Sequence, residues 1–130
     1  MKRYSAKLLF QWRSSRSPAR KRRLTEERIV TFQARSARSA LGKAKRAGRE
    51  GQTDFEVNGV RVRQEFIGVM ELIDVTHFDD GDDAEFREVW YQLVERVQPS
   101  GKRGNWIPHE SRLEALRAKI PNRKHHLKAW

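Results

Sequence analysis

The first part of the chain alternates between hydrophobic and polar residues. From residue 4 to residue 12 a hydrophobic side chain falls on every second position, and Leu9 is the single hydrophobic residue on the opposite face. A period of two predicts a half-buried β-strand. The alternation returns over residues 27–34 and predicts a second strand. The two strands can pair as a hairpin whose tip is the basic segment 13–23.

The pattern then changes to the spacing of an α-helix. Small hydrophobic residues recur three or four positions apart between Ala37 and Gly48, on a narrow face that can lie close against a sheet. Ser36 precedes them, and its hydroxyl can accept hydrogen bonds from first-turn amides, so we expect it to be the N-cap. Gly48 and Gly51 are expected to end the helix.

Strand patterns return after the helix. Asn58 and Gly59 supply the two positive-φ positions of a type I′ turn, which predicts a hairpin over residues 55–62. Residues 66–75 are nearly all hydrophobic and predict a central strand, in which Gly68 is a candidate bulge.

The last third of the chain is less clearly patterned. Residues 86–97 fit either a helix or a strand, and their β-branched and aromatic content favours the strand. Trp90 and Tyr91 are expected in the core. A short helix is expected after Pro108, followed by a basic tail.

These elements predict a single α+β domain. Its expected architecture is an antiparallel sheet of about five strands with one packed helix and a short C-terminal helix. Residues 1–97 would form the α+β core domain, and residues 98–130 a basic C-terminal extension that carries the short helix.

Charge adds to this picture, because basic and acidic residues are grouped in separate stretches of the chain. Residues 1–63 carry 18 basic and 5 acidic side chains, a net charge of +13, whereas residues 64–97 carry −8 and residues 98–130 carry +6. Polarised charge bears on partners rather than on fold. It indicates an anionic partner such as nucleic acid, or contacts with the chain's own acidic segment.

Two groups of basic residues are candidates for binding nucleic acid. Arginine side chains grip phosphates, and the release of condensed counterions drives such binding; Trp12, beside the basic loop, could stack on a base. The alternative is a solvated hairpin tip and an ordinary solvated helix face, in a chain that has 19 Arg to 9 Lys. The candidate residues are Arg13, Arg16, Arg20, Lys21, Arg22, Arg23, Arg38, Lys43, Lys45, Arg46 and Arg49.

Other chemistry finds little support. The chain has no cysteine, which excludes disulfides, thiolate metal sites and a cysteine nucleophile. The acidic turn at 79–83 lacks the spacing of a calcium loop, and no catalytic or phosphate-loop motif is present. We therefore expect no cofactor, no metal site, no catalytic residues and no enzyme activity. No signal peptide or membrane span is evident, which favours a cytoplasmic location.

Five short segments match a known family. They are residues 4–10 (YSAKLLF), 27–30 (ERIV), 33–36 (QARS), 65–69 (EFIGV) and 88–91 (EVWY). In this order they resemble the bacterial family called domain of unknown function 4288, over residues 3–97, with 88–91 as its last strand. The resemblance implies a small bacterial α+β domain with no assigned activity and no agreed catalytic residues. The basic segment 13–23 and the basic tail depart from the family's pattern.

The sequence therefore favours a non-enzymatic binding domain. The leading hypothesis is a nucleic-acid-associated domain. The alternative is a protein-interaction module, such as an immunity or accessory protein or a self-associating dimer, in which the acidic segment meets a basic surface. No membrane partner is expected.

Overall fold

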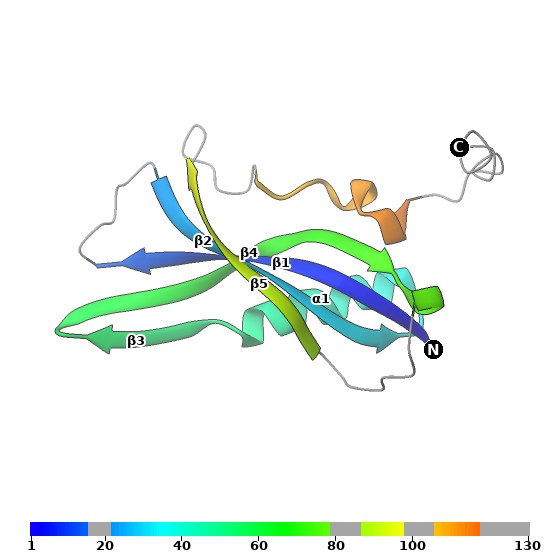
Figure 1. Ribbon diagram of the computed structural model, residues 1–130, viewed down its shortest axis with the longest axis horizontal. Helices are drawn as coiled ribbons and strands as arrows, with labels where there is room; N and C mark the ends of the chain where they lie inside the picture. Colours follow the sequence, from blue (N-terminus) through cyan, green and yellow to red (C-terminus); the bar gives the residue numbers. More distant parts are fainter. Residues whose placement is uncertain (16–21, 79–86, 98–105, 118–130) are drawn as a thin grey trace.

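The fold is a five-stranded antiparallel sheet with one α-helix packed on it (Figure 1). The computed structural model describes residues 1–15, 22–78, 87–97 and 106–117 of the 130-residue chain. The strands are β1 (Lys2–Ser14), β2 (Arg22–Ala34), β3 (Thr53–Val57), β4 (Val60–Asp74) and β5 (Arg87–Val97), in the spatial order β3-β4-β1-β2-β5. The α-helix is α1 (Ala37–Glu50), and three short 3₁₀ turns are η1 (Thr76–Phe78), η4 (Glu110–Arg112) and η5 (Glu114–Leu116). The predicted α+β class and antiparallel sheet are confirmed, and residues 87–97 form a strand.

Strands β1 and β2 are longer than their alternation predicted. Arg13 pairs with Arg63 of β4, and Arg22 pairs with Val97 of β5. The prediction that the whole of 13–23 is a loop was therefore wrong at Arg13, Arg22 and Arg23. Neighbouring strands on both sides supply backbone hydrogen-bond partners there, and these outweigh the loop composition.

Strand β4 is one continuous strand from the turn to Asp74. Asn58 and Gly59 both have positive φ, 51° and 78°, as the predicted type I′ turn requires. Where β4 pairs with β1, Met70 and Ile67 of β4 have no partner in the register. The pairing is therefore irregular on both sides of Gly68.

The main core lies between the sheet and α1. Tyr4, Leu8 and Phe10 of β1 join Phe32 of β2 and Leu72 of β4 in one buried cluster. Ala40, Leu41 and Ala44 face them from the helix, whose predicted N-cap, Ser36, accepts a hydrogen bond from the Ser39 amide at 3.1 Å. Small residues let the helix approach closely: a Cβ at Gly48 would stand 2.4 Å from the Phe66 ring.

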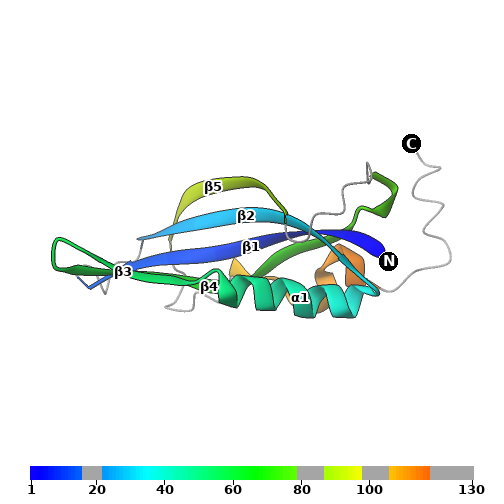
Figure 2. The same ribbon diagram turned by 90° about the horizontal axis from the view of Figure 1, so that it is seen from below.

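Because the sheet twists, strand β5 partly covers the face of the sheet opposite α1. Strand β5 crosses in front of β1 in Figure 1 and lies on the side away from α1 in Figure 2. Leu9, Gln11 and Glu27 on this face are buried. The expectation that Trp90 is a core residue was wrong, because it lies on this edge strand with 40% of its surface exposed.

Residues 106–117 complete the core on the helix side. Leu113 is buried in the main cluster, with Leu116 packed against it. The expected short C-terminal helix takes the form of the 3₁₀ turns η4 and η5. In Figure 1 this segment runs alongside β4.

The helix covers only part of its face of the sheet. α1 ends at Glu50, and Gly51 lies beside the Phe10 ring. The strands continue beyond the end of α1. We call the helix-side surface of this uncovered part of the sheet the open end. It carries Trp12, Leu24, Phe55, Val57 and Leu93.

Candidate nucleic-acid interface

The two predicted groups of basic residues lie at different places in the fold. α1 covers the half of the sheet nearer the start of β1, whereas β1 ends and β2 begins at the open end (Figure 1). Arg16, Arg20, Lys21 and the side chain of Arg22 lie outside the described residues. The structure therefore does not join the helix face and the β1–β2 end into one continuous surface.

The same end of the sheet carries, on the face away from the helix side, arginines that sequence analysis missed. Arg61 and Arg63 of β4 are both largely exposed, and both face Asp54, at 3.1 and 3.8 Å. Arg63 is the cross-strand neighbour of Arg13, whose guanidinium lies 3.6 Å from the Glu65 carboxylate. The alternation of arginine and valine over 60–63 was the available signal, since period two puts both arginines on one face.

The ends of the basic segment lie beside this hairpin. The Ser15 amide donates to the Arg61 carbonyl at 3.0 Å, and the Arg61 amide donates to the Ser15 hydroxyl at 3.3 Å. Arg23, half-buried, follows at the start of β2. Arginines of β1, β2 and β4 therefore gather at one end of the sheet.

Much of the charge on α1 is already paired. Glu110 of η4 accepts hydrogen bonds from Arg38, at 3.3 Å, and from Lys45. Lys43 donates to the Gln33 carbonyl at 2.9 Å. The five predicted helix residues are Arg38, Lys43, Lys45, Arg46 and Arg49, of which Arg46 and Arg49 have no ion-pair or hydrogen-bond partner among the described residues.

The contacts between Glu110 and α1 also change the pKa of the Glu110 carboxyl group. Its hydrogen bond from Lys45 and the charges of Lys45 and Arg38 hold its pKa below the ordinary glutamate value, and they outweigh a small opposing effect of burial. Glu110 thus joins residues 106–117 to the helix as an ionised carboxylate.

The open end also exposes hydrophobic side chains. Phe55, Leu24 and Leu93 have 42%, 45% and 52% of their surface exposed. Trp12 meets Phe55 edge to face, with ring centroids 6.2 Å apart. Phe55 pairs with Val62, whereas Arg13 and Asp54 pair with Arg63, so these hydrophobic side chains and the arginines lie on opposite faces of the same end of the sheet. Exposed hydrophobic groups of this kind are typical of a binding surface.

Two buried donors at the edge of this surface have no acceptor. They are the indole Nε1 of Trp12 and the amide Nε2 of Gln64, which are cross-strand neighbours. Arg28 donates to Oε1 of Gln64 at 2.8 Å, which fixes Nε2 as the donor end of that amide. Both atoms are buried, so a ligand does not reach them unless the surrounding side chains rearrange.

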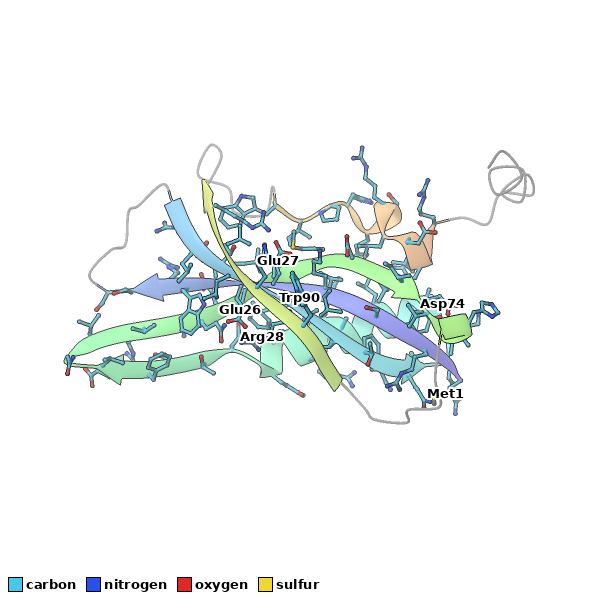
Figure 3. All side chains as sticks on the ribbon, in the orientation of Figure 1. Met1, Glu26, Glu27, Arg28, Asp74 and Trp90 are labelled. Atoms are coloured by element: carbon cyan, nitrogen blue, oxygen red, sulfur yellow. The ribbon has the colours of Figure 1, made fainter. Side chains whose placement is uncertain are left out.

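The face away from α1 carries a network of ion pairs. Lys7 lies 3.5 Å from both Glu27 and Glu71, and its Nζ is 5.9 Å from the centre of the Trp90 ring. Arg96 also pairs with Glu27. Figure 3 shows Glu27 and Trp90 near the crossing of β5 and β1. Part of the acidic segment is thus matched within the chain, whereas the predicted acidic turn at 79–83 lies outside the described residues.

A cavity of about 500 Å³ opens between α1, β4 and residues 107–113. Sequence analysis did not predict it, because its walls come from three segments far apart in the chain. Its lining residues are Leu41, Lys45, Arg49, Gln52, Phe66, Ile67, Gly68, Val69, Ile107, Pro108, Glu110 and Leu113.

Two other kinds of site were searched for within the described parts of the chain. No group of three or more histidine, aspartate and glutamate side chains there is placed to hold a metal ion. In the same residues, no helix has the length and hydrophobicity needed to cross a membrane.

Comparison with known proteins adds a family and nothing more specific. No curated protein and no solved structure matches the chain. The family described as "Domain of unknown function (DUF4288)" matches residues 3–86, from the start of β1 to just before β5. Segments 4–10, 27–30, 33–36 and 65–69 fall inside this match, whereas 88–91 lies beyond it. Since the match spans more than half of the chain, the protein belongs to the DUF4288 family.

Proposed function

We propose that the protein binds single-stranded nucleic acid at the end of its sheet that lies beyond α1. The observation that carries the proposal is the gathering of arginines on one face of that end, with exposed hydrophobic side chains on the other face, the open end. Arg13, Arg61 and Arg63 supply charge, and Phe55 and Leu24 supply apolar surface. Positive grooves with stacking side chains are the general means of binding single strands.

The charge at this end is only partly neutralised within the chain. Asp54 faces both Arg61 and Arg63, so one carboxylate serves two guanidinium groups. These ion pairs are exposed and therefore weak, and a phosphate can replace the carboxylate as a bidentate partner. The basic segment between Ser15 and Arg22 would add three further positive charges.

The aromatic pair would receive bases. A base has a flat face that stacks on an aromatic ring whatever its sequence. Stacking on an aromatic ring favours an unpaired strand over a duplex, whose bases are stacked within the helix.

The helix contributes less than the sequence suggested. Arg38 and Lys45 are held by Glu110, and Lys43 is held by a backbone carbonyl. α1 also packs its small face against the sheet, so it is not free to enter a groove. We therefore place the phosphate contacts at Arg13, Arg61 and Arg63, on the face of the sheet opposite the open end, and the helix residues become the natural control.

The test is a salt series with fluorescently labelled 20-nucleotide DNA, its RNA counterpart and the matching duplex DNA. Fluorescence anisotropy should show binding that weakens with salt and favours single strands. Replacing both Arg61 and Arg63 with Gln should lower affinity about tenfold and flatten the log–log salt slope by roughly 1.4, the value for two phosphate contacts to a single strand.

The matched control is the double replacement Arg38→Gln with Arg46→Gln on α1, which should leave affinity within about twofold. No binding at low salt would contradict the proposal. Binding that does not change with salt would contradict it too, and so would equal losses in the two double variants.

A protein partner is the second candidate function, and the edge strand favours it. β5 is the last strand in the sheet order, and Trp90 and Leu93 on it are exposed. An exposed strand edge can pair with a strand of a second copy. Light scattering over a concentration range should then show a nuclease-resistant dimer that Leu93→Lys dissociates. A monomer at all concentrations would exclude this self-association.

A further inference from the structure

The cavity beside α1 points to a ligand unrelated to nucleic acid. Its volume of about 500 Å³ falls within the range of small-molecule sites. Leu41, Phe66, Ile107 and Leu113 give it a hydrophobic wall. It lies on the covered half of the sheet, separate from the open end.

The wall is shaped by a close contact at Gly68. A Cβ at this position would stand 2.9 Å from Cγ1 of Ile107, so Ile107 lies directly against the β4 backbone. Any larger residue at 68 would push Ile107 away. The absence of a side chain thus lets residues 107–113 approach β4 and form one side of the cavity.

The polar groups of the lining are mainly donors. Oε1 of Gln52 accepts from the Phe66 amide at 3.0 Å, which leaves its amide nitrogen to donate. Arg49 is exposed and has no partner among the described residues. Lys45 uses one bond for Glu110, which is the single carboxylate among the lining residues. Positive charge therefore exceeds negative charge around the cavity.

Glu110 shows that this surface of α1 binds a carboxylate group. Its carboxylate lies between Lys45 and Arg38, one turn or more from Arg49 along α1. A second carboxylate at Arg49 would repeat this arrangement beside the hydrophobic wall. Charge-assisted bonds from arginine to carboxylate are among the stronger hydrogen bonds in proteins.

We propose that this cavity binds a small amphipathic carboxylate. Its aliphatic or aromatic part lies against Leu41, Phe66 and Ile107, and its carboxylate pairs with the Arg49 guanidinium. This assignment rests on the cavity alone and is independent of nucleic-acid binding.

The experiment is an NMR titration of the full chain with sodium octanoate, followed by ¹H–¹⁵N spectra. We expect saturable shifts in the amides of α1, Gly68 and residues 107–113. Octylammonium and 1-octanol serve as matched probes with the opposite charge and with no charge, and both should bind at least several-fold more weakly.

Arg49→Gln should weaken octanoate binding about tenfold, as the loss of one charge-assisted bond implies. Arg46→Gln, three residues earlier and also exposed, should leave the Kd within twofold, and Arg49→Lys should fall between. Both positions are exposed on the helix, so the fold should persist.

Four results would overturn the proposal: no saturable shift, equal binding of 1-octanol, shifts centred on Phe55 instead of the cavity, or equal effects of the Arg49 and Arg46 variants. Nucleic-acid affinity is measured separately and enters none of these outcomes.

Discussion

Strands β1 and β4 pass through two different environments. Beside α1 and residues 106–117 their helix-side residues, such as Leu8 and Leu72, are buried. Beyond the end of the helix the same face carries Phe55 and Leu24 in contact with solvent. The strand pairing is continuous through both regions, so backbone hydrogen bonding does not distinguish them. The burial of hydrophobic side chains is therefore concentrated in the covered half, whereas the open end keeps hydrophobic side chains exposed.

The largest contrast should come from removing one phenylalanine ring in each region. Phe32 is fully buried in the core, and Phe32→Ala should lower the free energy of unfolding by about 3–5 kcal/mol. Phe55 is half exposed, and Phe55→Ala should cost less than about 1 kcal/mol. Urea unfolding monitored by circular dichroism measures both. Similar losses in the two variants would remove the distinction between the halves.

Two glycines of α1 should respond oppositely to the same substitution. A Cβ at Gly48 would meet the Phe66 ring at 2.4 Å, so Gly48→Ala should destabilise the fold by about 1–3 kcal/mol. Nothing lies within 4 Å of a Cβ at Gly42, where alanine should add about 0.5–1 kcal/mol through helix propensity. Thermal unfolding of both variants tests this. Stabilisation by Gly48→Ala would mean that the helix lies farther from the sheet than described.

A smaller effect is expected from Trp12→Phe at the open end. The replacement keeps an aromatic ring beside Phe55 and removes an Nε1 donor that is buried. We expect single-strand affinity to fall by less than about threefold, whereas Phe55→Ala should lower it about fivefold or more because a stacking surface is lost. Anisotropy titrations at one salt concentration compare the two. Unchanged affinity in both variants would separate the aromatic pair from binding.

The smallest expected effect is a loosening of residues 106–117 in acid. The hydrogen bond from Lys45 lowers the folded-state pKa of Glu110 below its ordinary value of 4.5. A lowered folded pKa contributes stability that is present above the unfolded value and is lost as pH falls through the folded value. The protection factors of the Leu113 and Leu116 amides, which are corrected for the pH dependence of intrinsic exchange, should therefore fall below about pH 4.

Glu110→Gln provides the control for this pH effect. It should exchange faster than the parent chain at pH 7 and at the same rate in strong acid, since Glu110 is then protonated in the parent. Glu114→Gln, on the neighbouring 3₁₀ turn, should not reproduce that convergence. Equal exchange of parent and Glu110→Gln at pH 7 would show that the contact with α1 does not hold the segment.

Local patterns were sufficient for the elements of the fold. Ser36 as the N-cap and the Asn58–Gly59 turn depend on neighbouring residues, so their chemistry can be read directly from the sequence. The family resemblance was confirmed over most of its expected extent. The continuity of β4 was missed, because Gln64 and Glu65 interrupt its hydrophobic pattern although both are buried.

The candidate site depended on long-range contacts and was therefore harder to predict. Glu110 neutralises helix charges 65 and 72 residues earlier in the chain. The arginines of β4 join Arg13 only through strand register, and the cavity exists only where three distant segments meet. Counting charges along the sequence weights all basic residues equally, whereas the fold separates paired ones from exposed ones.

The burial of Leu113 has a consequence for the evolution of the domain. The segment that the family matches, residues 3–86, contains neither β5 nor Leu113, so it does not supply every surface that closes this chain's core. A relative that shares only that segment would need another hydrophobic element over Leu41 and another neighbour for β2. A truncated chain ending at residue 86 should therefore be prone to aggregation.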